Sequence, residues 1–201
     1  MSDSVDNSLT AFVLAGGRST RMGTDKAFLE IGGETLLARA IRTLEAVASD
    51  VRIVGSADKF GGDRPVVEDI YRGCGPLGGI HAALSTSPTE MNLMLAVDLP
   101  FIDAQFLNFM IGRARACDAI VTVPRSGGRF QPLCAVYRKS FAVVAEEALR
   151  VGQNKIDSLF PSITTLVVEQ SELEAEGFSP EIFRNLNTSA DWEQARRRLH
   201  K

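Results

Sequence analysis

Residues 12–26 hold the groups best suited to chemistry, in the order Phe-Val-Leu-Ala-Gly-Gly-Arg-Ser-Thr-Arg-Met-Gly-Thr-Asp-Lys. Paired glycines let the backbone take unusual φ values and approach a ligand closely, so that its N–H groups can point at phosphate oxygens. Arg18, Arg21 and Lys26 add positive charge, the arginines as planar forks and the lysine as a mobile point charge. The loop therefore predicts a site that handles phosphate groups.

This loop carries neither of the two common glycine-rich phosphate motifs. Residues 16–21 lack the G-x-G-x-x-G spacing of dinucleotide-binding proteins, and Gly23 does not begin the G-K-[ST] ending of a P-loop. An ordinary turn between a strand and a helix, with its basic side chains in solvent, is the alternative, because most glycine-rich turns bind no ligand.

Two aspartates stand where apolar segments end. Asp98 follows the apolar run of residues 93–97, and a carboxylate there can hold a hard cation such as Mg²⁺, which prefers oxygen ligands. A helix N-cap or a solvated loop aspartate is the alternative for this residue. Asp69 follows residues 66–68 and is a weaker signal on its own, because aspartates at strand ends commonly form turns.

The elements that must position these residues alternate along the chain. Strand character marks residues 11–14, 51–54, 65–67, 92–97, 119–123, 133–137 and 163–168, and helical spacing marks residues 34–48, 80–85, 103–116, 141–150 and 189–199. The repeated β-α-β order predicts an α/β fold, a three-layer sandwich around a mostly parallel central sheet. Ligands of such sheets bind beyond the carboxyl ends of the strands, where the glycine loop and both aspartates are expected.

Composition limits the classes of protein to which the chain can belong. The 201 residues suit one domain with a substantial core, and the net charge of −3 argues weakly against a broad nucleic-acid surface. The polar residues 1–8 predict a disordered tail rather than a signal peptide, and no apolar run has the length of a membrane span. Three widely spaced cysteines fit neither a disulfide framework nor a zinc site, which favours a reduced, cytoplasmic protein.

The segment from Leu14 to Lys26 resembles, letter for letter, the L-A-G-G-x-S-x-R-M-G-x-D-K loop of the molybdenum cofactor guanylyltransferase family. It is similar, more loosely, to the loop of sugar-phosphate nucleotidyltransferases. The resemblance spans residues 9–200. It implies a Rossmann-like nucleotide-diphospho-sugar transferase fold, with residues 1–201 forming a single nucleotidyltransferase domain.

The resemblance also implies a nucleotide site. It assigns GTP contacts to Leu14, Ala15, Gly16, Gly17, Lys26, Asp69, Gly78 and Asp98. Lys26 and Arg21 would offset charge on the transferring phosphate, and Asp98 matches the aspartate of a D-x-P segment that binds Mg²⁺. Residues 75–80 match a G-P-L-x-G loop, which is also a suitable start for a helix because proline is favoured in the first turn.

On the acceptor side, the resemblance points to two segments. Arg129 and Gln131 lie in a stretch that matches G-x-x-x-Q-P, where Arg129 would clamp the terminal phosphate of a pterin substrate and Gln131 would hydrogen-bond a heterocycle edge. Simple solvation is the alternative for Arg129. Asn185 and Asn187 match N-x-N-T, and alternation places both side chains on one face, with helix capping as the alternative.

The resemblance implies that GTP and Mo-molybdopterin react to give Mo-molybdopterin guanine dinucleotide and pyrophosphate, with Mg²⁺ as cofactor. Transient contact with an acceptor molybdoenzyme or its chaperone is expected with this activity, while the composition predicts a cytoplasmic enzyme that binds neither nucleic acid nor membrane. One departure concerns residues 54–57, Val-Gly-Ser-Ala, where guanylyl relatives often carry an asparagine.

The alternative functions are those of a molybdopterin cytidylyltransferase, a sugar-phosphate nucleotidyltransferase and a non-catalytic nucleotide-binding regulatory module. Cytidylyl relatives tend to read L-A-A-G at residues 14–17, which favours guanine here.

Overall fold

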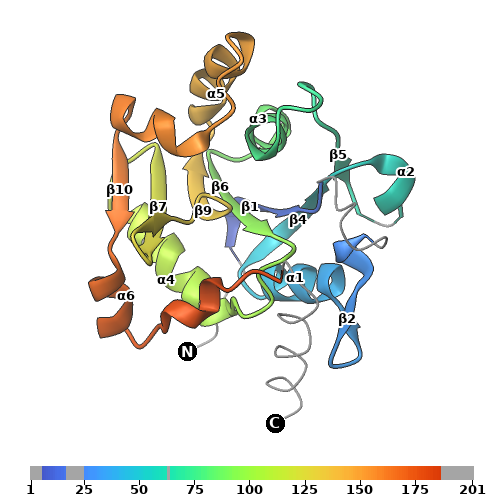
Figure 1. Cartoon of the computed structure of the whole chain (residues 1–201), viewed down its shortest axis with the longest axis horizontal. Helices are drawn as coiled ribbons and strands as arrows, with labels where there is room; N and C mark the ends of the chain where they lie inside the picture. Colours follow the sequence, from blue (N-terminus) through green and yellow to red (C-terminus); the bar gives the residue numbers. More distant parts are fainter. Residues whose placement is uncertain (1–5, 17–24, 63, 187–201) are drawn as a thin grey trace.

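The computed structural model describes residues 6–16, 25–62 and 64–186 (Figure 1). The main sheet contains β1 (Asp6–Leu14), β4 (Ala48–Val54), β5 (Val66–Val67), β6 (Met91–Ala96), β7 (Val121–Ser126), β8 (Arg129–Phe130), β9 (Cys134–Arg138) and β10 (Thr165–Val168). A separate hairpin pairs β2 (Glu30–Ile31) with β3 (Glu34–Thr35). The α-helices are α1 (Leu36–Glu45), α2 (Ala57–Phe60), α3 (Pro76–Thr86), α4 (Ala104–Arg115), α5 (Phe141–Arg150) and α6 (Gln170–Ala175). Three 3₁₀ helices complete the described chain, η2 (Lys26–Phe28), η3 (Ile156–Ser162) and η4 (Pro180–Phe183).

The strands of the main sheet follow the order β10-β7-β9-β6-β1-β4-β5, with β8 paired to β7. Along this order the neighbours run parallel except at β9, which is antiparallel to both β6 and β7. The predicted α/β fold with a mostly parallel sheet is therefore confirmed. The antiparallel direction of β9 is not part of the predicted fold.

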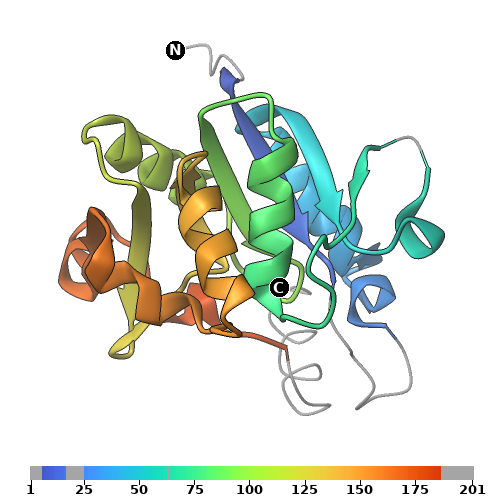
Figure 2. The ribbon, with the colours of Figure 1, turned by 90° about the horizontal axis from the view of Figure 1, so that it is seen from above.

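Helices cover both faces of the sheet and make three layers (Figures 1 and 2). Side chains of β1 alternate between the layers: Leu9, Ala11 and Val13 pack in the core with α1 and α4, while Phe12 packs with α3 and α5. Because successive side chains of a strand point to opposite faces, a strand covered on both faces must be apolar throughout. This explains the nearly unbroken apolar run of β6. None of the described helices is long and apolar enough to cross a membrane.

The carboxyl ends of the parallel strands meet at one edge of the sheet. Leu14 is in register with Val54 and with Ala96, and Val54 is in register with Val67. Since β9 is antiparallel to β6 and begins at Cys134, the loop before β9 reaches the same edge. The loops after β1, β4, β5 and β6 and the one before β9 are therefore among those at this edge.

Several element boundaries differ from the predicted ones. The sequence places residues 6–8 in a disordered tail, and this prediction is wrong, because β1 begins at Asp6. Residues 1–5 and the predicted helix at 189–199 lie outside the described residues. The predicted helix at 34–48 is shorter, because Thr35 pairs in the β2–β3 hairpin and its hydroxyl caps α1 by accepting from the N–H of Ala38 at 3.1 Å.

Candidate functional site

Lys26 and Asp98 form an ion pair at the shared edge of the sheet. Asp98 follows β6, and Lys26 begins η2, which Asp25 caps by accepting a hydrogen bond from the backbone N–H of Ala27 at 3.1 Å. Lys26 Nζ lies 3.4 Å from Asp98 Oδ2, and the two side chains are 21% and 22% exposed. Ion pairs open to solvent stabilise a fold by only about 0–1 kcal/mol, so a charged ligand can compete for both groups.

The start of the glycine loop is held against β4 by its backbone. The N–H groups of Ala15 and Gly16 both donate to the carbonyl oxygen of Val54 at 3.0 Å, and the N–H of Val97 donates to the carbonyl of Leu14 at 3.2 Å. A Cβ at Gly16 would meet only ordinary contacts, 3.7 Å from the Val54 oxygen. Neighbouring protein atoms therefore do not require glycine at this position. Because the position is exposed, a glycine here leaves room for a ligand to approach the backbone closely.

Three predicted residues of this loop, Gly17, Arg18 and Arg21, lie outside the described residues.

Asp69 follows β5, and its carboxylate lies beside the first turn of α3. A Cβ at Gly79 would lie 3.4 Å from Asp69 Oδ1, and a Cβ at Gly78 would lie 3.7 Å from Asp69 Oδ2. Burial raises the pKa of Asp69 above its usual value. Within the described part of the chain, this carboxylate makes no hydrogen bond or ion pair. A partly buried carboxylate with a raised pKa and no partner is a candidate for ligand binding.

Gly78 is required by its own surroundings. A Cβ there would lie 2.8 Å from the backbone oxygen of Tyr71, closer than Cβ atoms come to other atoms in folded proteins. The helix that it belongs to begins at Pro76 without a side-chain cap, after Gly75 with a φ of +66°. Pro76 has no backbone N–H, and the N–H of Gly78 already donates to the carbonyl of Gly75 at 3.1 Å. The start of α3 therefore offers few free donors to a negatively charged ligand.

A cavity of about 230 Å³ opens beside Asp98. Its walls come from the loop after β6, from β8, from the loop before β9, from η3 and from the C-terminal segment, and are formed by Ala96, Asp98, Leu99, Phe130, Gln131, Pro132, Leu133, Cys134, Asp157 and Asn185. The N–H of Leu186 donates to the carbonyl of Asp98 at 3.2 Å, which brings the C-terminal segment to this site. The structure thus brings together three predicted residues, Asp98, Gln131 and Asn185.

Two other predicted residues of the acceptor side are not among the cavity walls. Arg129 is exposed on β8, next to Phe130, and no hydrogen bond or ion pair within the described residues involves its side chain. Asn187 lies outside the described residues.

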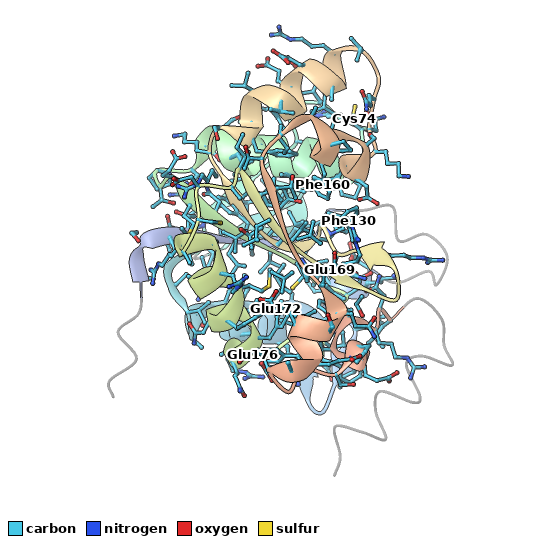
Figure 3. The ribbon with its side chains drawn as sticks, turned by 90° about the vertical axis from the view of Figure 1, so that its left-hand side faces the viewer. Cys74, Phe130, Phe160, Glu169, Glu172 and Glu176 are labelled. Carbon is cyan, nitrogen blue, oxygen red and sulfur yellow. The ribbon has the colours of Figure 1, made fainter. Side chains whose placement is uncertain are left out.

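The ring of Phe130 forms a fixed wall of the cavity. The guanidinium carbon of Arg125 lies 4.4 Å from its centroid, and the ring of Phe160 meets it edge-on at 5.1 Å and 85°. Figure 3 shows Phe130 and Phe160 next to each other. Arg125 is itself held by Glu169, with 3.1 Å between the ion-pair atoms. These contacts fix the ring before any ligand arrives.

Asp157 is a cavity residue that the sequence reading misses. It lies in η3, between α5 and β10, far along the chain from the other polar residues of the cavity. The available signal is a single carboxylate within a mostly apolar stretch, Ile156 to Phe160. That signal is weak, because the stretch carries no recognisable motif.

The oxygen groups at this site suit a particular kind of metal binding. Asp98 and Asn185 line the same cavity and offer carboxylate and amide oxygens. In the described residues, no three His, Cys, Asp or Glu side chains gather into a group that could hold a metal ion. The site therefore fits Mg²⁺, which commonly takes one or two protein ligands and completes its shell with water and substrate phosphates.

Comparison with known proteins gives matches over most of the chain. Residues 11–164 match the MobA-like NTP transferase domain. A probable molybdenum cofactor guanylyltransferase of Pelotomaculum thermopropionicum is 39% identical over 190 residues, which cover 93% of this chain and 91% of that protein. The molybdenum cofactor guanylyltransferase of Syntrophotalea carbinolica is 34% identical over 192 residues, covering 94% and 90%.

Solved structures agree on the fold. The crystal structure of molybdopterin-guanine dinucleotide biosynthesis protein A from Archaeoglobus fulgidus has a TM-score of 0.84 at 23% identity, covering 95% of this chain and 98% of that one. The 2-C-methyl-D-erythritol 4-phosphate cytidylyltransferase of Thermus thermophilus has a TM-score of 0.70 at 16% identity, covering 96% and 98%. At such identities a structural likeness shows the fold alone. The matched domain and the 34–39% identity to the two relatives show that this chain belongs to the MobA-like nucleotidyltransferase family, with the molybdenum cofactor guanylyltransferases.

Proposed function

We propose that this protein transfers GMP from GTP to the terminal phosphate of Mo-molybdopterin, giving Mo-molybdopterin guanine dinucleotide and pyrophosphate. The names of the relatives, matched over more than nine-tenths of this chain, support the proposal. The observation that carries it is the position of the Lys26–Asp98 pair. The pair stands between the end of β1 and the cavity lined by Gln131 and Asn185, where two phosphorylated substrates would meet.

GTP would bind along the edge formed by the loops after β1, β5 and β6. The proposed contacts are Leu14, Ala15, Gly16, Gly17, Lys26, Asp69, Gly78 and Asp98. The exposed position of Gly16 supports this arrangement, as does the carboxylate of Asp69 beside the start of α3, which has no partner among the described residues. The phosphates would lie toward Lys26, because its ammonium group is held at this edge by Asp98.

Mo-molybdopterin would occupy the cavity on the other side of Asp98. Gln131 and Asn185 line that cavity, which supports their assignment to the acceptor site. Arg129 and Asn187 are proposed as further contacts, Arg129 because an arginine beside Phe130 has the donor geometry to clamp a terminal phosphate.

The chemistry is an in-line displacement at the α-phosphorus of GTP. An oxygen of the acceptor's terminal phosphate forms a bond to this phosphorus, and the bond from the phosphorus to the α,β-bridging oxygen breaks, so that pyrophosphate leaves with the electron pair. The attacking oxygen is already anionic, so the reaction needs no strong general base. Lys26 and Arg21 would offset the negative charge of the transferring group and of pyrophosphate, and the loop backbone would hold the phosphates in position.

Nucleotidyltransferases of this family generally use a divalent metal, and we propose Mg²⁺. Asp98 would be its protein ligand, in keeping with the oxygen groups around the cavity. When bound, the ion would neutralise charge on phosphate oxygens. Lys26, which pairs with the same carboxylate, would hold its positive charge beside the phosphates.

We further propose that the enzyme acts in the cytoplasm and passes its product on through transient contact with an acceptor molybdoenzyme or its chaperone. Cys74, Cys117 and Cys134 are all described and none forms a disulfide, which supports a reducing compartment. Cross-linking of the purified protein to an acceptor molybdoenzyme, with and without bound product, tests the contact.

The test of the proposed function is pyrophosphate release with Mg²⁺ and each of GTP, CTP, ATP and UTP, with and without Mo-molybdopterin. Release with GTP only when the pterin is present supports the proposal. Release with CTP instead assigns the chain to cytidylyl transfer. If the folded protein releases no pyrophosphate with any of the four nucleotides, the proposal is contradicted. That result favours another acceptor, such as a sugar phosphate, or a binding module.

A further inference from the structure

Asp157 is held rigidly in the wall of the cavity. Its neighbours in η3, Ile156, Leu159 and Phe160, are buried in the core shared with α5. This anchoring leaves the half-buried Asp157 carboxylate facing the cavity, where it makes no hydrogen bond or ion pair within the described residues. A carboxylate that is partly removed from water and has no partner favours a ligand that donates hydrogen bonds.

The charge of Asp157 also acts on Tyr137, a buried residue that is hydrogen-bonded to the cavity wall. Burial, and to a smaller extent the nearby charge of Asp157, raise the pKa of Tyr137 well above its usual value. The Tyr137 hydroxyl donates to the carbonyl of Pro132 at 2.8 Å, and Pro132 is part of the cavity wall. The Tyr137 hydroxyl therefore donates to Pro132 and not to Asp157, so the Asp157 carboxylate is available in the cavity as a hydrogen-bond acceptor.

The other walls fit a flat ring. Phe130, Pro132 and Leu133 give apolar surface, and Gln131 adds one amide that can both donate and accept. The volume of about 230 Å³ is below the roughly 300–1,000 Å³ of pockets that hold a whole drug-sized ligand, so it suits one ring system of a larger substrate.

We propose that Asp157 determines specificity for the pterin ring of the acceptor by accepting paired hydrogen bonds from its 2-amino group and adjacent ring N–H. This inference rests on the proposed function and names the side chain that recognises the pterin ring of the acceptor. A carboxylate accepts two such parallel bonds, and bonds to a charged group are the strong ones. Its negative charge repels the phosphate of the same substrate, which directs that phosphate toward Lys26.

The first test compares Asp157→Asn with the wild-type protein in steady-state kinetics. Loss of a hydrogen bond to a charged group raises the KM for Mo-molybdopterin about tenfold to a hundredfold, while the KM for GTP stays the same. Glu147→Gln is the matched control, because it removes one carboxylate charge from an exposed position on α5 away from the cavity. An unchanged KM for Mo-molybdopterin in Asp157→Asn overturns the inference.

The second test measures binding directly, with pterin (2-amino-4-oxopteridine) and lumazine (2,4-dioxopteridine) as fluorescent probes. Lumazine carries an oxygen in place of the 2-amino group, and this oxygen faces the Asp157 carboxylate unfavourably. The wild-type protein and Glu147→Gln bind pterin more tightly than lumazine. Asp157→Asn loses this preference, because its amide can donate to the lumazine oxygen. Equal binding of the two probes by the wild-type protein, or an unchanged preference in the variant, overturns the inference.

The two tests separate this inference from the proposed function. Absence of GMP transfer to Mo-molybdopterin by the wild-type protein, with an Asp157-dependent preference for pterin, refutes the proposed function and supports pterin recognition. Normal transfer with no effect of Asp157→Asn in either test supports the function and refutes the role of Asp157. A merely structural role for Asp157 would change stability and both KM values, and would leave the choice between probes unaltered.

Discussion

The pairing of Lys26 with Asp98 places two opposite charges at one point of the proposed site. Both side chains are about one-fifth exposed, and their charged atoms lie 3.4 Å apart, so solvent and ligands can reach them. A pair of this kind adds little to stability, and its value lies in holding two opposite charges ready at one point. Triphosphate oxygens would attract Lys26, while a divalent ion would attract Asp98.

Lys26→Ala should lower turnover at least about a hundredfold, because it removes a preorganised positive charge from the transferring phosphate. The melting temperature should change little, since the lost ion pair is partly exposed. Lys59→Ala is the matched control: this lysine also pairs with an aspartate, Asp25, at 2.8 Å, and it is more exposed. Pyrophosphate release measured at saturating GTP gives the answer, and near-native turnover in Lys26→Ala would remove this residue from the mechanism.

Asp69→Asn should weaken GTP binding and stabilise the free protein. Loss of a charged acceptor for the nucleotide should raise the KM for GTP about tenfold or more. Isothermal titration with GTP and thermal melting of the same variant measure the two effects. An exposed carboxylate on α2, changed in Asp58→Asn, is the control. Unchanged affinity for GTP would contradict the assignment of Asp69 to the nucleotide site.

The stability effect of Asp69 has a definite dependence on pH. Burial raises its pKa, so the folded state holds a proton that the unfolded chain has already lost. The contribution of Asp69 to stability is therefore full below the unfolded pKa and is lost as the pH rises through the folded pKa. The melting temperature of Asp69→Asn should exceed that of the wild type at about pH 7, and the difference should shrink as the pH falls through the folded pKa.

At the scale of elements, the start of α3 is fitted closely to the loop that carries Asp69. Gly78→Ala should destabilise the protein by about 1–3 kcal/mol, because the new Cβ would press on the backbone oxygen of Tyr71 at 2.8 Å. It should also raise the KM for GTP, since Tyr71 and Asp69 belong to the same loop. Gly112→Ala is the control, because nothing lies within 4 Å of a Cβ at this exposed position of α4. That change should stabilise by about 0.5–1 kcal/mol. Urea denaturation compares the two, and equal effects would show that the start of α3 is not tightly fitted.

The direction of β9 shows how a prediction can be right about an element and incomplete about the sheet. The apolar run at residues 133–137 predicts a strand, and the structure has one at Cys134–Arg138. Its antiparallel direction follows from the short connection over residues 127–133, since a parallel crossover needs about a dozen residues or more. That signal is in the sequence, and it explains why Gln131 reaches the same edge as Asp98.

The two halves of the site differ in how far the sequence can predict them. Gly16, Asp69 and Asp98 each follow a parallel strand, so the order of strands alone brings them to one edge. Asp157 comes from η3, whose place depends on how Ile156 and its neighbours pack against α5. Such packing between distant segments has no local signature, and the sequence therefore gives only a weak indication of this residue.

At the scale of the whole molecule, the two faces of the sheet form the core, and its carboxyl edge carries the proposed binding site. Both faces are covered by helices and form the core, as Figures 1 and 2 show, and the carboxyl edge is left for the loops. On that edge Gly16, Asp69 and the start of α3 lie on the side of β1, β4 and β5, and the cavity lies on the side of β9. Asp98, after β6, stands between them. This division suits one enzyme that joins two separately bound substrates.

The most direct test of the account follows the phosphorus atoms of GTP into the product. The purified protein is incubated with Mg²⁺, Mo-molybdopterin and GTP labelled with ³²P at either the α or the γ position, and the pterin product is separated and counted. Guanylyl transfer predicts that α label enters the pterin product while γ label leaves in pyrophosphate. Entry of γ label into the pterin, or failure of both labels to enter it with folded protein and intact Mo-molybdopterin, would contradict guanylyl transfer.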